Sequence, residues 1–503
     1  MAGSPIDIAL PDEAATQRLG EDLARALRPG DMVHLRGDLG AGKTTLARAV
    51  IRAVADDEGL EVPSPTFTLV QSYELRLPVH HLDLYRLGTP DELDELGVEE
   101  LAEDGVALVE WPEHGGDALP RATLVVELTQ EDGARRAAIE GAPPAMERVS
   151  RSLDIRRFLH DAGWGAAHRR YLQGDASTRT YETVTLAGQA PRILMDAPAH
   201  SSGPPVRDGK PYAQIAHIAE SVTPFVAIDR MLGEAGFAVP AIHAADLDVG
   251  LLLIEHLGGG AFPDPAGKPI TERYEAAAEL LAAVHARSWP REIALDGGHV
   301  HRIPDFDRQA MLIEVELLLD WYLPDITGKP VDDRLRRDYV AAWNTVLDRL
   351  AGAQTSVVLR DFHSPNIIWR AERQGLDRLG IIDFQDAMLG PAAYDVASLA
   401  LDARVTISPA LEAAIVSAYT RARAAASGFD KASFEEAYAI MGAQRNAKIM
   451  GLFVRLHRRD GKPAYRDHLP RVREYLARCL EHPALEPVAR FCAAHDLLKQ
   501  ARA

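Results

Sequence analysis

Apolar and glycine-rich segments alternate near the N-terminus in an order that predicts a strand, a tight loop and a helix. The stretch DMVHLRG, residues 31–37, has the apolar core of a short buried strand, and KTTLARAVIRAVA, residues 43–55, has apolar positions at helical spacing. Between them lies GDLGAGKT, residues 37–44, with the GxxxxGKT pattern of a phosphate-binding loop. This pattern needs a strand before it and a helix after it, and both are predicted here.

The residue types of this loop suit the binding of phosphate groups. Glycines let the backbone N–H groups turn inward onto phosphate oxygens, and the helix N-terminus adds a partial positive charge. A lysine reaches the outer phosphates, and the hydroxyl that follows it can ligate Mg²⁺. The predicted nucleotide-binding residues are Gly37, Gly40, Gly42, Lys43, Thr44 and Thr45, with Thr44 also a metal ligand.

Two carboxylates close apolar strands further along the same region. Asp83 ends the strand in PVHHLDLYRL, and Glu110 ends the strand in GVALVEWPE. Mg²⁺ usually takes a further carboxylate from a buried strand near the phosphate loop. Each residue alone could be a helix cap or a surface ion pair, but together behind the loop they are predicted to bind metal or position water.

A second constellation lies far downstream. In LRDFHSPNIIW, residues 359–369, Asp361 and Asn366 have the D-x-x-x-x-N spacing of kinase catalytic loops. Asp383 then ends the apolar strand in RLGIIDFQD, where a second metal carboxylate is expected. The prediction is that Asp361 acts as the base for an attacking hydroxyl, while Asn366 and Asp383 hold Mg²⁺ on ATP. Asp395 is predicted to be structural, accepting backbone hydrogen bonds at a helix start.

Composition and charge set the organisation of the chain. The chain has 503 residues, which predicts two or three domains. Residues 1–150 hold 13 Lys and Arg against 29 Asp and Glu, and the remainder holds 42 against 45. An acidic surface repels a phosphate backbone, so no direct nucleic-acid binding is expected of the first part. The polar and Pro-containing residues 130–150 predict a linker, and the boundary is placed at residue 147.

Other features point to the cytoplasm. No apolar run is long enough to span a membrane, and MAGSPIDIALPDEAATQ lacks the pattern of a secretory signal. Only Cys479 and Cys492 are present, too few for a disulfide framework, which suits a reducing compartment. The stretch 197–213, rich in Ser, Pro and Gly, is predicted to be a surface loop.

Four motifs in order, GDLGAGKT, SPTFTLVQSYE, HHLDLYRL and LVEWPE, resemble the TsaE family, the small bacterial ATPase of tRNA threonylcarbamoyladenosine biosynthesis. The resemblance covers about residues 10–130. It implies that Asp83 coordinates the metal, that Glu110 is needed for hydrolysis, that Thr66 lies in a switch-like segment and that Trp111 lies beside the nucleotide. It also implies protein partners, the threonylcarbamoyl-transferase subunits, in agreement with the acidic charge.

The later motifs resemble the aminoglycoside phosphotransferase family over about residues 155–490. Within that family GDASTRTY, ILMDAP, LRDFHSPNIIW and IIDFQDAMLGPAAYDVASL are most similar to the bacterial cell-wall amino-sugar kinases of the AmgK type. The resemblance implies phosphorylation of the anomeric hydroxyl of N-acetylmuramate or N-acetylglucosamine in peptidoglycan recycling. YLQGDASTRTYETVTL would cover phosphates, the backbone from Glu255 to Leu257 would contact adenine, and Arg445 and Lys448 would help to wall the sugar site.

One position departs from the kinase pattern. Kinases of this fold usually carry a lysine on the third strand, but RILMDAP has Met195 there. Either another cation, such as Arg179 or Arg192, replaces it, or nucleotide binding is weak. An inactive pseudokinase scaffold is therefore one alternative. Phosphorylation of another alcohol, such as an aminoglycoside, choline or homoserine, is a second, and a general nucleotide switch in the first domain is a third.

The predicted fold is multidomain. An α/β P-loop NTPase domain, residues 1–146, is followed by an α+β bilobal protein-kinase-like domain, residues 147–503. The nucleotide lobe is placed at about 155–258 and the catalytic and substrate lobe at about 259–495. The predicted cofactors are ATP and Mg²⁺, and each domain is expected to keep its own ATP reaction.

Overall fold

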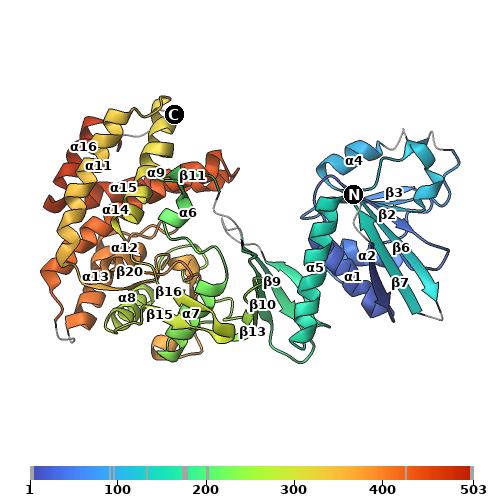
Figure 1. Cartoon of the computed structure of the whole chain (residues 1–503), viewed down its shortest axis with the longest axis horizontal. Coiled ribbons are helices and arrows are strands. Elements are labelled where there is room, and N and C mark those ends of the chain that lie inside the picture. Colours follow the sequence, from blue (N-terminus) through green and yellow to red (C-terminus); the bar gives the residue numbers. More distant parts are fainter. Residues whose placement is uncertain are drawn as a thin grey trace. The chain divides into compact units, whose positions relative to one another are not determined.

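The computed structural model describes residues 5–89, 92–93, 97–131, 134–172, 179–199, 203–424 and 428–498. It divides into two compact units, Met1–Asp196 and Ala197–Ala503, each described by itself (Figure 1). No helix in the described part of the chain is long and apolar enough to cross a membrane.

The first unit is built on a seven-stranded sheet of order β1-β7-β6-β2-β5-β4-β3. Strands β2, β4, β5 and β6 run parallel to their mutual neighbours, while β1, β7 and β3 join by antiparallel pairing. The strands are β1 Ile6–Leu10, β2 Asp31–Arg36, β3 Val70–Tyr73, β4 Val79–Asp83, β5 Val106–Glu110, β6 Leu124–Glu131 and β7 Ala134–Gly141. Helices α1 Glu13–Ala26, α2 Lys43–Ala55, α4 Val98–Asp104 and α5 Pro143–Asp161 accompany them.

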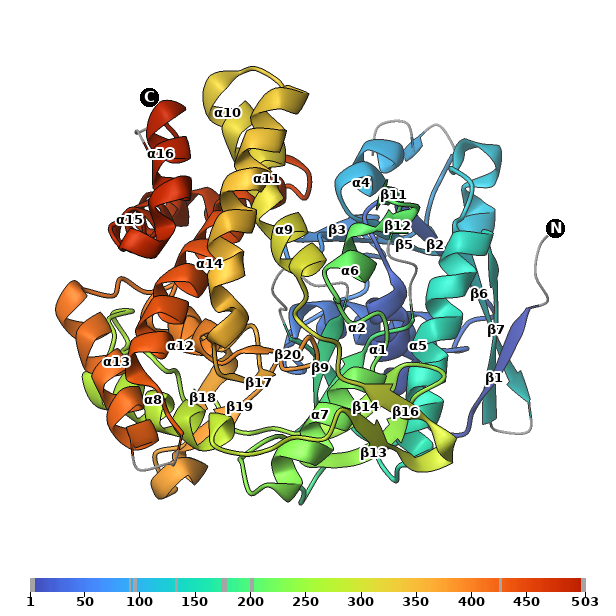
Figure 2. The ribbon, with the colours of Figure 1, turned by 60° about the vertical axis from the view of Figure 1, so that its left-hand side comes forward.

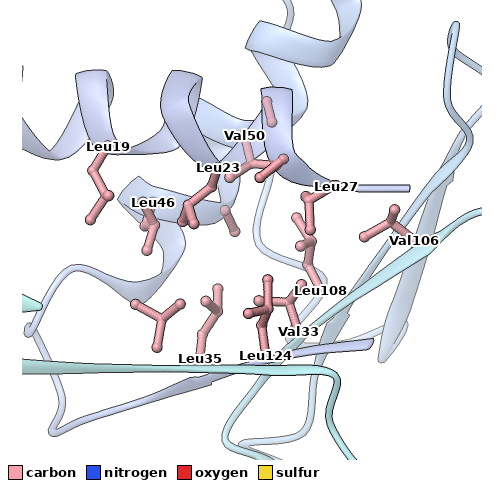
Figure 3. Packing of buried hydrophobic residues seen from close by; sticks show 14 of the residues in the cluster. Leu19, Leu23, Leu27, Val33, Leu35, Leu46, Val50, Val106, Leu108 and Leu124 are labelled. Atoms are coloured by element: carbon pink, nitrogen blue, oxygen red, sulfur yellow. The ribbon is translucent and has the colours of Figure 1, made fainter. Parts of the chain in front are cut away.

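The main core of this unit lies between the sheet and helices α1 and α2. Leu19, Leu23 and Leu27 from α1 and its end, with Leu46 and Val50 from α2, face the apolar side chains of the strands (Figure 3). The facing strand residues are Val33, Leu35, Val106, Leu108 and Leu124. Burial of this apolar surface fixes α2, and therefore the loop before it, against the carboxyl ends of the parallel strands.

The linker expected at residues 130–150 is instead regular structure. Strand β7 pairs along its whole length with β6, and Pro143 opens helix α5, where its missing N–H is tolerated. Ala137 and Ile139 of β7 are buried in the core. Three further strands of the first unit follow α5: β8 His168–Leu172, β9 Thr180–Thr185 and β10 Arg192–Asp196. Strand β9 pairs antiparallel with both β8 and β10.

The second unit contains further antiparallel strand pairs. The antiparallel pairs are β11 Pro205–Arg207 with β12 Lys210–Pro211, β13 Ile242–Asp246 with β14 Leu251–Glu255, β15 Glu292–Ala294 with β16 Val300–Arg302, β17 Thr355–Val358 with β20 Met388–Pro391, and β18 Ile367–Trp369 with β19 Leu379–Ile381. The stretch 203–213, expected as a loop, therefore contains the short β11–β12 hairpin.

Helices form the rest of this unit. Their bounds are α6 Tyr212–Ile215, α7 Thr223–Glu234, α8 Thr271–His285, α9 Arg308–Leu317, α10 Leu323–Thr327, α11 Asp333–Leu347, α12 Ala393–Ala400, α13 Pro409–Ala424, α14 Lys431–Arg458, α15 Leu469–Cys479 and α16 Glu486–Ala494. A π-helical turn, Leu318–Tyr322, separates α9 from α10. Helix α14 packs against α9, α12 and α15 and is buried through its middle (Figure 2).

Candidate functional sites

The predicted phosphate loop joins β2 to α2 in the conformation that its glycines require. Gly37, Gly40 and Gly42 have φ values of 130°, 83° and 108°, which L-residues rarely adopt. A Cβ on Gly37 would also lie 2.2 Å from the carbonyl oxygen of Leu128. The loop is therefore specified both by backbone conformation and by the closeness of strand β6.

Lys43 is held inside the loop. Its Nζ donates to the carbonyl oxygens of Gly37 at 2.7 Å and Asp38 at 3.0 Å, and lies 3.4 Å from the centroid of the Trp111 ring. Burial lowers the pKa of Lys43, and the nearby Glu110 carboxylate opposes this shift. The ammonium group is therefore held by neutral carbonyl partners, which a bound phosphate would replace with a charged one.

Asp83 and Glu110 lie side by side, because β4 and β5 pair in parallel with these two residues in register. Glu110 accepts a 2.8 Å hydrogen bond from the Thr44 hydroxyl and lies 2.8 Å from Nε2 of the buried His81. Asp83 accepts 2.6 Å and 3.1 Å hydrogen bonds from the Ser64 hydroxyl and the Tyr85 N–H. The structure therefore brings both predicted carboxylates to the phosphate loop.

The remaining residues predicted for this site lie nearby in the fold. Thr45 is on the first turn of α2, and Thr66 lies in the turn that leads to β3. Sequence reasoning missed Ser64 and His81, which orient the two carboxylates. Their signal was present, since Ser64 begins the SPTFT motif and His81 precedes Asp83 by two positions, on the same face of a fully buried strand.

In the second unit, the loop after β17 is shaped by Asp395. Its carboxylate accepts hydrogen bonds from the N–H groups of Leu359 at 2.6 Å and Arg360 at 2.9 Å. Arg360 itself has a φ of 71°. The structural role predicted for Asp395 is present, but its partners are in the Asp361 loop and not at the start of its own helix.

The three predicted catalytic and metal-binding residues lie together. The Asn366 amide donates to the Asp361 carbonyl oxygen at 2.9 Å and to Asp383 Oδ2 at 3.2 Å. The Gln385 amide donates to Asp383 Oδ1 at 3.0 Å. Phe384 stacks on Phe225 of α7 with ring centroids 4.9 Å apart, which anchors the Asp383 segment.

A cluster of buried charges lies beside Asp361. Arg445 Nη2 on α14 is 3.7 Å from Asp361 Oδ1. Lys448 Nζ is 2.7 Å from Oε1 of the fully buried Glu314, which also pairs with Arg360. Burial opposes ionisation of Asp361, but Lys448 and Arg445 outweigh it and lower the pKa of Asp361 to about 2. Sequence reasoning missed Glu314, an acid inside an apolar helix.

The predicted hinge follows β14. Glu255 ends that strand, and its side chain accepts a 3.1 Å hydrogen bond from the Ala241 N–H. Leu257 is buried and packs against Gly380 of β19. A Cβ on Gly380 would lie 3.0 Å from Cδ1 of Leu257. Strand β19 ends two residues before Asp383, so Leu257 lies next to the strand that leads to this predicted metal ligand.

A methionine of β10 stands where kinases of this fold usually carry a lysine. Met195 is buried on β10 opposite Tyr181 of β9. Arg192, offered as a substitute cation, lies over the Trp164 ring at 4.3 Å, and burial lowers its pKa. Arg179 directly precedes β9, whose first residue pairs with Asp196. The predicted phosphate-covering turn, residues 173–178, lies outside the described residues.

Both sites offer oxygen donors that suit Mg²⁺. Thr44 with Asp83, and Asn366 with Asp383, each combine a carboxylate with a hydroxyl or amide oxygen beside the predicted position of the phosphates, and Mg²⁺ commonly takes its other ligands from phosphates and water. Within the described ranges, no group of three or more His, Cys, Asp and Glu is arranged to hold a metal ion. The donor sets therefore fit a metal that arrives with the nucleotide.

A phosphate loop in one unit and a kinase-type catalytic loop in the other define an ATP-using enzyme with two sites. Family comparison agrees: residues 10–138 match the threonylcarbamoyl adenosine biosynthesis protein TsaE, and residues 168–429 match the phosphotransferase enzyme family. The chain belongs to the phosphotransferase enzyme family, and its first part belongs to the TsaE family. It is a P-loop ATPase joined to a small-molecule phosphotransferase, which confirms both resemblances and the predicted fold class.

Individual relatives match one part each. The N-acetylmuramate/N-acetylglucosamine kinase of Caulobacter vibrioides is 34% identical over 338 residues, 65% of this chain and 92% of that protein. The tRNA threonylcarbamoyladenosine biosynthesis protein TsaE of Haemophilus influenzae is 39% identical over 133 residues, 25% of this chain and 83% of that protein. A choline/ethanolamine kinase family protein from Mesorhizobium loti aligns over 69% of this chain and 99% of that one, with 15% identity and a TM-score of 0.42.

Proposed function

We propose that the second part of the chain is a cytoplasmic kinase that transfers the γ-phosphoryl group of ATP to the anomeric hydroxyl of N-acetylmuramate or N-acetylglucosamine, in cell-wall recycling. The observation that carries this proposal is the grouping of Asp361, Asn366 and Asp383 in a chain 34% identical to a kinase named for those sugars. The products would be ADP and the sugar 1-phosphate.

In this proposal Asp361 accepts the proton of the attacking hydroxyl. Arg445 and Lys448 keep its carboxylate ionised, and Asp395 fixes the backbone that carries it. Asn366 and Asp383 would hold Mg²⁺, which when bound neutralises charge on the phosphates. The backbone from Glu255 to Leu257 would bind adenine, and the buried Met195 would leave contacts with the inner phosphates to other groups.

We further propose that the first part supports tRNA threonylcarbamoyladenosine modification through protein partners, the threonylcarbamoyl-transferase subunits, without binding nucleic acid itself. Support comes from the likeness to TsaE proteins and from the acidic charge of residues 1–150. Gly37, Gly40, Gly42, Lys43, Thr44 and Thr45 would bind ATP, with Trp111 beside it. Thr44 and Asp83 would hold Mg²⁺, and Glu110, oriented by His81, would position the attacking water.

The substrate proposal is tested with purified protein, Mg-ATP and a panel of acceptors: N-acetylmuramate, N-acetylglucosamine, an aminoglycoside, choline and homoserine. We expect a mass increase of one phosphate on the two amino sugars alone. Loss of the product on mild acid treatment would place the phosphate on the anomeric oxygen, since glycosyl phosphates are acid-labile. Product on choline, homoserine or the aminoglycoside instead would contradict the sugar assignment, and no product from any acceptor would favour a pseudokinase.

The charges around Asp361 predict a pH effect. The pKa of Asp361 is depressed to about 2, so the carboxylate is ionised, and able to accept a proton, at every pH above that value. Lys448 is the strongest of the groups that lower this pKa. In a Lys448→Met variant the pKa should rise by about one unit or more, and the acid limb of the kcat/KM profile should move to higher pH. Sugar phosphorylation measured from about pH 2.5 to pH 7, with folding followed at each pH, checks this, because both expected acid limbs lie below pH 4.

The control for this prediction is Lys431→Met. Lys431 is an exposed lysine on the same helix, paired with Glu435 at 3.3 Å. Its replacement should leave the pH profile where it is. An unmoved acid limb in a folded Lys448→Met enzyme would contradict the role given to Lys448.

A further inference from the structure

The first unit contains an ion-pair cluster, buried at its centre, that joins residues from both families. This junction cluster consists of Glu21, Asp22, Arg156, His168, Arg169 and Glu182. The first two lie on α1, inside the TsaE match, and the last three on β8 and β9, inside the phosphotransferase match. Arg156 lies on α5, between the two matches. All six residues are within Met1–Asp196.

Arg169 is the centre of the junction cluster. Its side chain is fully buried and binds both oxygens of Glu182, at 2.7 Å and 2.9 Å. It also donates to Asp22 at 2.8 Å and to the Ser152 carbonyl oxygen at 3.1 Å. Burial opposes its charge, but Glu182 and Asp22 outweigh that effect and raise the pKa of Arg169. One guanidinium therefore ties β8 to β9, α1 and α5.

Arg156 completes the junction cluster from α5. It donates to both carboxylate oxygens of Asp22, with a closest distance of 2.9 Å, and to Glu21 at 3.0 Å. It also donates to the carbonyl oxygen of Ala167 at 2.7 Å, just before β8. His168 Nδ1 lies 2.7 Å from the other oxygen of Glu21. A buried charge is costly unless all its partners are in place, so these segments depend on one another.

The same helix α1 also contacts the phosphate-loop helix. Helices α1 and α2 pack together closely, since a Cβ on Gly20 would lie 2.4 Å from the Cβ of Ala49. Gly20 adjoins Glu21 and Asp22 in sequence, while α2 begins at Lys43. A continuous set of packed groups therefore connects the phosphate loop with strand β8.

We propose that the ATPase part and strands β8 and β9 of the phosphotransferase part form one cooperative unit, in which nucleotide bound at the phosphate loop stabilises those strands. A ligand that binds only the folded state stabilises the whole unit that must unfold with its site. Such coupling is reciprocal, so the state of β8 and β9 also affects nucleotide affinity at the phosphate loop.

The test measures amide hydrogen exchange of residues 179–185 and 168–172 in the full chain, with and without a non-hydrolysable ATP analogue. A Lys43→Ala chain retains the kinase nucleotide site, so the difference between it and the wild type isolates the phosphate loop. We expect the analogue to slow exchange in β8 and β9 about tenfold more in the wild type than in Lys43→Ala. Equal protection in the two chains would overturn the proposal.

Two further variants test the junction cluster itself. Asp22→Asn should abolish the extra protection, and the milder Arg156→Lys, which keeps the charge but loses the planar fork, should reduce it and serves if Asp22→Asn does not fold. Asp338→Asn, which breaks the exposed 3.9 Å pair with Arg334, is the matched control and should retain full protection. Undiminished protection in both junction variants would also overturn the proposal.

Discussion

Replacing Asp361 by Asn is expected to lower the rate of sugar phosphorylation by about 10²- to 10⁴-fold, the usual contribution of a positioned general base. The asparagine amide has nearly the same size as the Asp361 carboxylate, but it cannot accept a proton near neutral pH. The loop should keep its shape, because its N–H groups are held by Asp395 and not by Asp361. The rate is measured by following sugar phosphate by mass at saturating Mg-ATP.

The matched control is Asp377→Asn. Asp377 is a half-exposed carboxylate of the same unit, paired with Arg370 at 3.3 Å, and a pair that is partly open to solvent contributes less to stability than a fully buried one. Its rate should stay within about twofold of the wild type. ATP hydrolysis at the phosphate loop should be intact in both variants. If a folded Asp361→Asn chain kept its phosphorylation rate within about tenfold of the wild type, another group would have to be the base.

Much of each site followed from short sequence patterns, because the chemistry there is local. The strand and helix around the phosphate loop fall where they were predicted, at Asp31–Arg36 and Lys43–Ala55. The signals for these two elements are local in the sequence: the spacing of apolar residues, and glycines at the positions where the backbone has a positive φ. The grouping of Asp361 with Asn366 and Asp383 followed for a related reason, since one short hairpin, β18–β19, connects them.

Long-range partners did not follow from the sequence. Glu314 lies 46 positions from Arg360, and only the packing of α9 on α14 brings it next to Lys448. The acids of α1 behave likewise: Asp22 has the sequence context of a solvated helix face, yet it is buried under Arg156 and Arg169. A charged residue has no sequence signal for burial when its partner lies more than 130 residues away.

The segment 130–150 was misjudged for a different reason. Its polar and Pro-containing sequence suggested a linker, yet Ala137 and Ile139 lie on one buried face, with the less buried Ala138 between them on the other face, in the two-residue period of a strand. Pairing with β1 and β6 on either side supplies the hydrogen bonds that stabilise it. Composition alone underestimates such a strand, because small residues suit positions where helices pack closely against a sheet.

Replacing Lys43 by Ala is expected to lower ATP hydrolysis at the phosphate loop by about 10²- to 10³-fold, because a preorganised cation at the outer phosphates is lost. The loop itself should persist, since its three glycines and the contact of Gly37 with β6 fix its backbone. Hydrolysis is best measured in chains that also carry Asp361→Asn, so that phosphate released by the kinase site makes no contribution. Lys431→Ala, on the exposed face of α14, is the control and should hydrolyse ATP at the parental rate.

The decisive comparison is sugar phosphorylation by Lys43→Ala in an otherwise wild-type chain. The groups proposed for phosphoryl transfer, Asp361, Asn366 and Asp383, are all in the second unit, so the rate should stay within about threefold of the wild type. The coupling through the junction cluster stabilises strands and supplies no group to the reaction. A collapse of sugar phosphorylation in a folded Lys43→Ala chain would therefore mean that the phosphate loop takes part in the kinase reaction. In the hydrolysis experiment, persistent ATP hydrolysis by the Lys43→Ala chain that also carries Asp361→Asn would mean that Lys43 does not bind the phosphate that is released.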